Sequence, residues 1–313
     1  MRLFTYLSKG QVRSARLIDQ LGIDISSASK LYFQSYNKFN SLQSEVLPVE
    51  LPALMQLGSD RQKLISSVTD WAAECYKQKA INNNDDVVFE FDKAHLMAPI
   101  IRPGKVICIA GNYPSLNKME CPEYPTVFLK PSGGVIGHLE TILIPPLCES
   151  VAYEVELAIV IGRQCKNLKV EEAFSVIAGY MLANDLGDRM LEKRTSQWTS
   201  GKMFDTFTPM GPIMFTRDEI GDVNNLEVVT KVNDQIVQKS NTSHMFFDVP
   251  HLVAYLSTLT TLDCGDVILT GSPKLIGDQP NPVCELKSGD LIEVSIEGMG
   301  SLINPINVEN QVI

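Results

Sequence analysis

The middle of the chain contains the stretch YEVELAIVIG at residues 153–162. Successive side chains of a β-strand point to opposite faces, so Glu154 and Glu156 project from the same face. That face becomes apolar immediately afterwards, at Ala158 and Val160, while the opposite face is apolar throughout. Because a strand that is apolar on both faces is generally buried, the stretch predicts a central strand of a covered sheet.

The two glutamates of this strand are expected to lie close enough to bind one cation together. Their Cα atoms are expected about 6 to 7 Å apart, a span that two flexible carboxylates close around one hard cation. The alternative is an exposed strand face on which Glu154 and Glu156 pair with lysines of a neighbouring strand. Burial favours the cation, because an unpaired buried carboxylate costs several kcal/mol.

A third carboxylate, Asp185, follows the small and apolar run AGYMLAN at residues 178–184. An aspartate at the exit of a buried strand is well placed to complete a triad with Glu154 and Glu156. The alternative is a turn residue or a helix N-cap. Three carboxylates without cysteine or histidine favour Mg²⁺ or Mn²⁺ over zinc.

Two cationic residues follow the triad. Arg189 comes first, and Lys202 lies within QWTSGKMFDTFTPMGP at residues 197–212. Gly201 and the Pro- and Gly-rich exit predict an irregular loop that presents the lysine to an anionic substrate. The alternative is a surface lysine paired with Asp205.

Composition and charge exclude several classes of protein. The 313 residues carry a formal net charge of -10, with no cluster of Lys and Arg, so nucleic acid is not an expected partner. Most of the acidic excess is expected to be solvated surface. The apolar runs are too short to span a membrane, and the first residues do not resemble a secretory signal. The seven scattered cysteines favour free thiols, and we predict a cytoplasmic protein.

The chain divides into two regions by composition. Residues 1–100 are polar and mixed, with a β-like opening at 2–7 and an amphipathic helix over 60–77, and are interpreted as a small accessory domain. Residues 101–313 are interpreted as the catalytic domain, an α+β, β-dominated unit. Helices are predicted in it at 171–177 and 248–259. Its predicted strands are 106–110, 127–129, 157–161, 226–237 with a hairpin turn at Asn233-Asp234, 267–270 and 291–296.

Several motifs together resemble the fumarylacetoacetate hydrolase family. They are YEVELAIVIGR, AND, QWTSGKMFDTFTPMGP, VNDQIVQKSNT and GDVILTGSP, and the resemblance runs from about Pro103 to the C-terminus. The N-terminal segment resembles the accessory domain of the subgroup that includes oxaloacetate tautomerases. The resemblance implies a mixed β-roll core, a homodimer, and a small 2-oxo acid or β-diketone as substrate.

The resemblance also assigns roles to individual residues. It implies that Glu154, Glu156 and Asp185 ligate Mg²⁺ or Mn²⁺. Lys202 matches the lysine beside the substrate and is the predicted catalytic residue. The predicted substrate-binding residues are Arg189, Lys202 and Ser272, the last of which falls where many members have threonine.

The chain departs from the family pattern near the substrate. Family hydrolases activate water with a histidine that follows the G-x-N-Y motif, and in GNYPSLNKME at residues 111–120 its place is taken by Leu116. No histidine occurs between His95 and His138. In addition, Glu192 stands where a substrate-contacting glutamine is common, and Met190 replaces an aspartate.

The missing histidine decides which chemistry is expected. We expect steps that need only a metal-stabilised enolate, namely tautomerisation, decarboxylation or lyase-type cleavage, with oxaloacetate as one example of the substrate. One alternative is a C–C bond hydrolase of acylpyruvate or fumarylacetoacetate-like β-diketo acids. Another is a catalytically silent member that binds a metal or ligand.

Overall fold

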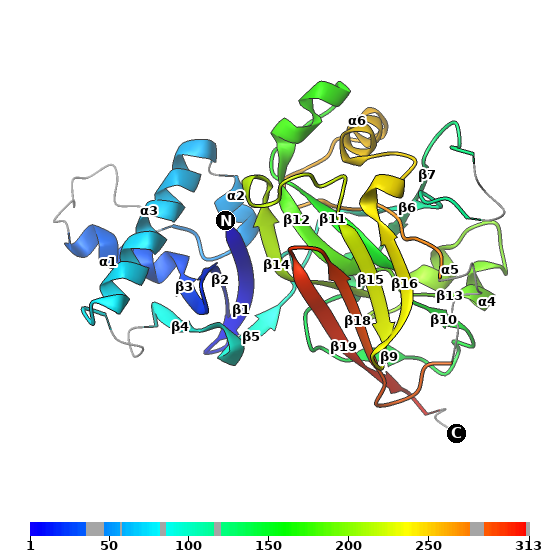
Figure 1. Cartoon of the computed structure of the whole chain (residues 1–313), viewed down its shortest axis with the longest axis horizontal. Coiled ribbons are helices and arrows are strands. Elements are labelled where there is room, and N and C mark those ends of the chain that lie inside the picture. Colours follow the sequence, from blue (N-terminus) through cyan, green and yellow to red (C-terminus); the bar gives the residue numbers. More distant parts are fainter. Residues whose placement is uncertain (36–46, 57, 82–85, 116–119, 276–284, 311–313) are drawn as a thin grey trace.

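The computed structural model describes residues 1–35, 47–56, 58–81, 86–115, 120–275 and 285–310. This part of the chain is β-dominated and mixed, with few helices, which confirms the predicted fold class. Two sheets pack against each other at its centre (Figure 1). Side chains from both sheets, such as Leu157, Leu182, Val228 and Val294, share one hydrophobic core.

The larger sheet takes its strands from residues 2–269. It has 12 strands within the described residues, of which ten form one path and two, β5 and β8, pair with β1 and β14 beside it. In path order the strands are β4 (Val88–Glu90), β3 (Leu21–Asp24), β2 (Gln11–Ile18), β1 (Arg2–Ser8), β14 (Thr208–Thr216), β12 (Ile177–Asn184), β11 (Val155–Ile161), β17 (Val267–Leu269), β6 (Val106–Ala110) and β7 (Thr126–Lys130). The additional strands are β5 (His95–Met97) and β8 (Val135–Ile136).

Strand β11 lies inside this sheet, as its sequence predicts. Every residue from Val155 to Ile161 is buried, and the strand pairs with β12 on one side and β17 on the other. Both pairings are antiparallel. Its two faces are covered separately: Leu157 and Ile159 pack in the core shared with the second sheet, and Ala158 and Val160 pack in another apolar cluster.

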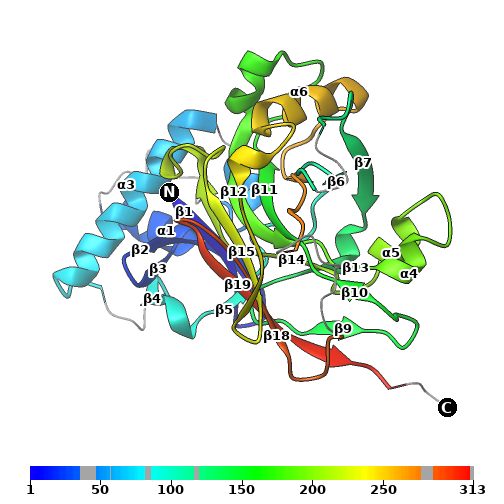
Figure 2. The same ribbon diagram turned by 45° about the vertical axis from the view of Figure 1, so that its right-hand side comes forward.

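The second sheet crosses the first and covers one of its faces (Figure 2). Its five described strands, in order, are β16 (Gln235–Asn241), β15 (Glu227–Val232), β18 (Leu291–Ile296), β19 (Gly300–Val308) and β9 (Ile142–Ile144). Strands β15 and β16 form the predicted hairpin, and Asn233 and Asp234 both adopt positive φ, as a two-residue turn of this kind requires. A small ladder pairs β10 (Val151–Ala152) with β13 (Gly187–Asp188).

Helices cover the edges and ends of the sheets. The α-helices are α1 (Ile25–Ser35), α2 (Leu51–Met55), α3 (Gly58–Lys77), α4 (Arg189–Glu192), α5 (Thr199–Lys202) and α6 (Val249–Leu259). The 3₁₀ turns are η2 (Phe91–Lys93), η3 (Ser132–Gly134), η4 (Val170–Val176), η5 (Arg217–Glu219) and η6 (Thr242–His244). Helix α6 begins after Asp248, whose side chain accepts a hydrogen bond from the His251 amide, as the sequence predicts.

The helix predicted at 171–177 is present as a 3₁₀ helix and ends one residue early. The segment forms the 3₁₀ turn η4 and then passes directly into β12 at Ile177. A run this short gains little from α-helical hydrogen bonds, and the adjoining strand fixes its last residue.

The N-terminal residues extend the large sheet. Strand β1 pairs with β14 through Arg2↔Phe215 and Leu3↔Met214, and α1 and α3 lie beside β3 at the left of Figure 1. The division of the chain at residue 100 remains a prediction. Within the described ranges, none of the helices has the length and apolar character needed to cross a membrane.

Candidate active site

Three carboxylates meet where β11 and β12 lie side by side. Glu154 immediately precedes β11, Glu156 lies within it, and Asp185 immediately follows β12. The Asp185 amide donates to the Glu154 carbonyl over 2.9 Å, so the pairing of the two strands carries the side chains to one place. One carboxylate oxygen from each residue lies within 4.8 Å of those of the other two.

The electrostatics of this cluster suit a cation. Glu156 and Asp185 are 2% and 1% exposed. Burial, together with the nearby charges of Asp185 and Glu154, raises the pKa of Glu156 far above its ordinary value. The Oδ2 atom of Asp185 is buried and accepts no hydrogen bond, although Lys202 Nζ lies 3.1 Å away. Three hard oxygen donors that repel one another fit a divalent cation of the magnesium or manganese class.

Lys202 reaches this cluster from the end of the short helix α5. The predicted irregular loop was therefore wrong at this residue, because Thr199–Lys202 form one helical turn. The lysine is 3% exposed, and its Nζ lies 2.6 Å from Glu154 Oε2. Burial alone lowers the pKa of Lys202, but the Asp185 and Glu154 carboxylates outweigh it and raise the pKa above its ordinary value. The alternative of a surface lysine paired with Asp205 was wrong.

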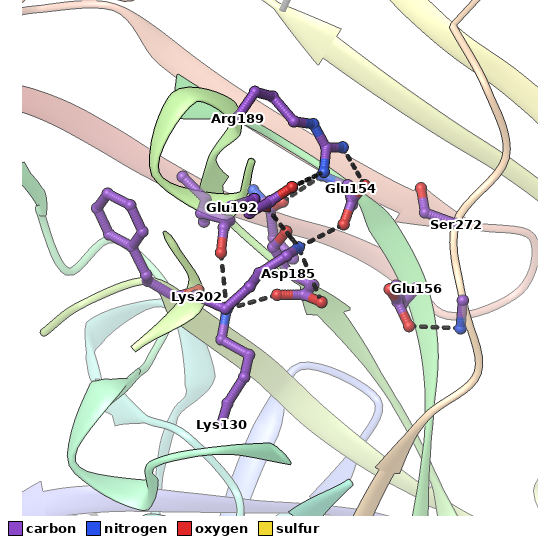
Figure 3. Close-up of polar contacts among 12 residues, drawn as sticks. Lys130, Glu154, Glu156, Asp185, Arg189, Glu192, Lys202 and Ser272 are labelled. Carbon is purple, nitrogen blue, oxygen red and sulfur yellow. Dashed lines mark hydrogen bonds and ion pairs between the residues drawn. The ribbon is translucent and has the colours of Figure 1, made fainter. Parts of the chain in front are cut away.

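Arg189 lies on the other side of Glu154 and is held by two carboxylates. Its Nη2 donates to Glu154 Oε1, and its Nη1 donates to Glu192 Oε2 over 2.7 Å (Figure 3). It opens α4, which is capped by Asp188: Oδ1 of that aspartate accepts hydrogen bonds from the Met190 and Leu191 amides over 3.0 and 2.8 Å. Both terminal nitrogens of the guanidinium thus contact the protein, and the predicted contact with substrate remains a prediction.

Lys130 is a site residue that sequence reasoning missed. It ends β7, its side chain is 0% exposed, and its Nζ contacts Asp185 Oδ1 over 2.5 Å. The same ammonium donates to the Leu186 and Phe207 carbonyls over 2.8 and 2.7 Å. The signal was a lysine that ends a β-rich run before Pro131, but its acceptors lie more than fifty residues along the chain. Lys130 therefore fixes one oxygen of Asp185 and leaves the other facing Lys202.

Replacing Lys130 with methionine is expected to destabilise the fold. The change leaves the buried Asp185 carboxylate and two buried carbonyls without their shared donor, and breaking a buried pair in this way costs about 3 to 5 kcal/mol. Urea denaturation in EDTA measures it. The control is Lys231→Met, which removes a more exposed pair with Glu293 and should cost less than about 1 kcal/mol. Equal losses in the two variants would contradict this role for Lys130.

The segment after β17 also contacts the carboxylate cluster. The Gly271 amide donates to Glu156 Oε2 over 2.5 Å. Gly271 has a φ of +97°, and an added Cβ would lie 2.8 Å from Asn112 Cβ, so the position requires glycine. The next residue, Ser272, lies beside Glu156 in Figure 3 and accepts a hydrogen bond from Gln238 Nε2 over 3.1 Å. Leu116 lies outside the described residues.

A separate cavity of about 440 Å³ lies between strands of the N-terminal region. Its lining includes Arg13 and Lys9, but each already has an acidic partner: Asp24 accepts two hydrogen bonds from Arg13 over 2.7 Å, and Asp86 pairs with Lys9. None of the residues of the carboxylate cluster lines this cavity. We therefore place the candidate active site at the cluster.

Comparison with known proteins shows the family of the chain. The family described as fumarylacetoacetate (FAA) hydrolase C-terminal matches residues 105–307, which include Glu154, Glu156, Asp185 and Lys202. The chain belongs to the fumarylacetoacetate hydrolase family, and the resemblance seen in the motifs is confirmed.

Three individual proteins illustrate what the chain is similar to. The fumarylacetoacetate hydrolase domain-containing protein 2 homolog of Dictyostelium discoideum is 36% identical over 324 residues, which cover 98% of this chain and 97% of the relative. The rat (Rattus norvegicus) protein named mitochondrial oxaloacetate tautomerase Fahd2a is 39% identical over 214 residues, 67% of this chain and 68% of the relative. Among solved structures, 5-carboxymethyl-2-hydroxymuconate delta-isomerase from Mycobacterium smegmatis matches with a TM-score of 0.73 and 28% identity, covering 99% of this chain and 100% of that one.

Proposed function

We propose that this protein is an enzyme that binds one divalent cation and converts a small 2-oxo acid through its enolate, by tautomerisation, decarboxylation or lyase-type cleavage. The observation that carries the proposal is the meeting of three buried or partly buried carboxylates with Lys202 and Arg189 on both sides of Glu154. The tautomerase and isomerase named among the similar proteins support this class of reaction.

The fit of the cluster indicates which residues would hold the cation. Glu154, Glu156 and Asp185 would supply the oxygen ligands, and Mg²⁺ or Mn²⁺ is the expected ion. When bound, such an ion polarises the keto oxygen of a 2-oxo acid and stabilises the negative charge of its enolate.

The chain's own cations have a complementary role. The Asp185 and Glu154 carboxylates raise the pKa of Lys202 in the metal-free protein, so its Nζ is available as a hydrogen-bond donor and positive charge. Lys202 and Arg189 would bind the substrate carboxylate or the developing oxyanion, and donors aimed at such a charge are worth about 10² to 10³ in rate.

The histidines of the chain favour enolate chemistry over hydrolysis. Within the described residues, none of them contacts the carboxylate cluster. His138 accepts a hydrogen bond from the Ile303 amide, His244 pairs with Ser240, His251 pairs with Asp248, and His95 lines the N-terminal cavity. A water-activating imidazole is therefore absent from the described part of the site. Enol–keto conversion moves a proton between the enol oxygen and the neighbouring carbon and consumes no water, whereas C–C hydrolysis needs an attacking water.

A panel of 2-oxo acids tests the proposed reaction. Purified protein with Mg²⁺ or Mn²⁺ is expected to convert enol-oxaloacetate to its keto form, or to decarboxylate or cleave a related acid, and to lose this activity in EDTA. Recovery on addition of metal completes the test. Hydrolysis of acetylpyruvate at an ordinary enzymatic rate would instead support the C–C hydrolase alternative, and no turnover of any 2-oxo acid would leave the catalytically silent alternative.

Metal binding is expected to stabilise the fold. A ligand that binds only the folded state adds about 2.7 kcal/mol at one hundred times its dissociation constant. We expect Mn²⁺ to raise the melting temperature measured by differential scanning fluorimetry, and oxalate, which mimics the two adjacent oxygens of an enolate, to raise it further. Oxalate without metal is the control and should give a much smaller shift.

Other aspects of the protein remain proposals. We propose a homodimer, testable by analytical ultracentrifugation, and a cytoplasmic location, testable by fractionation of the source cells. The rat relative carries a mitochondrial name, which makes that second measurement informative. The substrate is the proposed partner, and the net charge of -10 supports neither nucleic acid nor an anionic membrane surface as another.

A further inference from the structure

Glu192 is a buried carboxylate that lies beside the cluster without belonging to it. Its side chain is 8% exposed, and its Oε2 accepts the hydrogen bond from Arg189 Nη1. Its other oxygen, Oε1, is buried and accepts no hydrogen bond, with Lys202 Nζ 3.9 Å away. Glu192 therefore faces two cations of the site, Arg189 and Lys202. It is not among the three residues whose oxygens converge.

The backbone around Glu192 is shaped to admit it. An added Cβ at Gly201 would lie 2.6 Å from Glu192 Cγ, and one at Gly187 would collide with Oε1 and lie 2.7 Å from Lys202 Cδ. Contacts that close are essentially never made by a real Cβ. The absence of a side chain at both glycines thus leaves space for the Glu192 carboxylate beside Arg189 and the side-chain carbons of Lys202.

The two terminal nitrogens of Arg189 are divided between two acids. Nη2 contacts Glu154 and Nη1 contacts Glu192, so each carboxylate receives one N–H group (Figure 3). An arginine beside a single carboxylate commonly forms two parallel hydrogen bonds with it, and this fork is among the strongest ion pairs in proteins. Glu192 therefore occupies the nitrogen that would complete such a fork on Glu154.

We propose that Glu192 is a positioning residue that shares Arg189 with Glu154 and thereby leaves Glu154 able to bind the divalent cation. The inference rests on the proposed metal site. Both oxygens of Glu154 already face a cation of the chain, Oε1 facing Arg189 and Oε2 facing Lys202. A metal ion must displace part of this pairing, and a second arginine hydrogen bond on Glu154 would make that displacement harder.

Glu192 also keeps Arg189 in place once Glu154 turns toward a metal. When the Glu154 carboxylate shares its charge with a divalent ion, its hold on the guanidinium weakens. Glu192 retains the other nitrogen, so Arg189 stays beside the site with Nη2 released for a substrate carboxylate. The same residue thus lowers the competition for Glu154 and fixes the arginine that would meet the substrate.

A double-mutant cycle on Mn²⁺ affinity tests this role. Isothermal titration calorimetry or Mn²⁺ electron paramagnetic resonance gives the dissociation constant without reference to activity. Glu192→Gln is expected to weaken Mn²⁺ binding about 10-fold, the size typical for residues that orient metal ligands. Glu192→Asp, which keeps the charge but shortens the reach to Arg189, is expected to weaken it as well.

The Arg189→Met variant shows whether Glu192 affects Mn²⁺ binding through Arg189. In Arg189→Met, which removes one of the two cations that compete for Glu154, Mn²⁺ should bind at least as tightly as in the wild type. Adding Glu192→Gln to that variant should then change the dissociation constant by less than about 2-fold, because the two residues act through one another. Glu293→Gln, which removes the acid paired with Lys231 outside the site, is the matched charge control and should change nothing.

The outcomes separate this inference from the proposed function. If the wild type does not bind Mn²⁺, the proposed metal site fails. If it does bind, but Glu192→Gln binds equally well, or weakens binding by the same factor with and without Arg189, the positioning role is overturned. A Glu192→Asp affinity equal to that of the wild type would also overturn it, since charge alone would then suffice. Circular dichroism of each variant confirms that the compared proteins are folded.

Discussion

Glu156→Gln is expected to abolish Mn²⁺ binding and to lower kcat/KM for the 2-oxo acid by about 10³-fold. Glu156 is a buried ligand of the proposed cation, 2% exposed. Lewis-acid stabilisation of a developing enolate is worth several kcal/mol, at about 1.4 kcal/mol for each factor of ten in rate. Titration calorimetry with Mn²⁺ and the enol-oxaloacetate assay measure the two effects.

The melting temperature of metal-free Glu156→Gln is the control for folding. The glutamine amide retains an oxygen that accepts the Gly271 N–H. It replaces a carboxyl group whose pKa is raised by burial and by the charges of Asp185 and Glu154. The metal-free melting temperature of Glu156→Gln should therefore equal or exceed that of the metal-free wild type. Full activity in Glu156→Gln, or undiminished Mn²⁺ binding, would contradict the assignment of this residue.

Lys202→Met is expected to lower activity about 100-fold without weakening metal binding. The loss follows from the removal of a charged donor beside the substrate. Mn²⁺ affinity is expected to stay the same or to rise, because Lys202 Nζ contacts Glu154 Oε2 over 2.6 Å and Asp185 Oδ2 over 3.1 Å and so competes for two of the proposed ligands.

This opposite response of activity and affinity separates the roles of Lys202 and Glu156. The matched control is Lys231→Met, which removes a lysine from an ion pair on the second sheet and should leave both quantities unchanged. Loss of Mn²⁺ binding in Lys202→Met would show that the lysine supports the metal site as a whole. Unchanged turnover would show that it has no part in the reaction.

The sequence predicted the centre of the fold because local patterns there agree with tertiary packing. The stretch at 153–162 is apolar on both faces, and β11 is buried on both faces. Asp248 with Pro250 predicted the start of α6, and Asn233-Asp234 predicted the turn between β15 and β16. In each case the residues that specify the structure are neighbours in the chain, so a short window contains the information.

The sequence predicted which carboxylates meet, but it did not predict what surrounds them. Lys130 contacts Asp185, Leu186 and Phe207 across more than fifty residues, and no periodicity connects these positions. The departure at Glu192 was visible in the sequence. Its sharing of Arg189 with Glu154 depends on the tertiary structure, in which α4 follows directly on β13 and brings Arg189 beside both acids. Long-range pairing of charged groups is fixed by the assembled sheet and cannot be read from local propensity.

Several local predictions failed where tertiary contacts prevail over sequence pattern. The segment around Lys202 forms the helical turn α5, which packs beside β13 and β7. Of the N-terminal strands, only the opening one was predicted. Strand β2 carries mixed polar residues, among them Arg13 and Arg16, whose guanidinium groups pair with Asp24 and Asp70. Such strands lack the alternating pattern that identifies a half-buried strand.

The proposed cation site comprises Glu154, Glu156 and Asp185, beside Lys202. Anomalous diffraction from a crystal grown with Mn²⁺ and oxalate tests this site most directly. We expect a single strong anomalous peak between the three carboxylates, about 2.1 to 2.2 Å from their oxygens, with oxalate facing Lys202 and Arg189. A crystal that binds Mn²⁺ elsewhere, or in which no ion lies between the three carboxylates and Glu154 and Asp185 still pair only with the chain's own cations, would contradict this assignment.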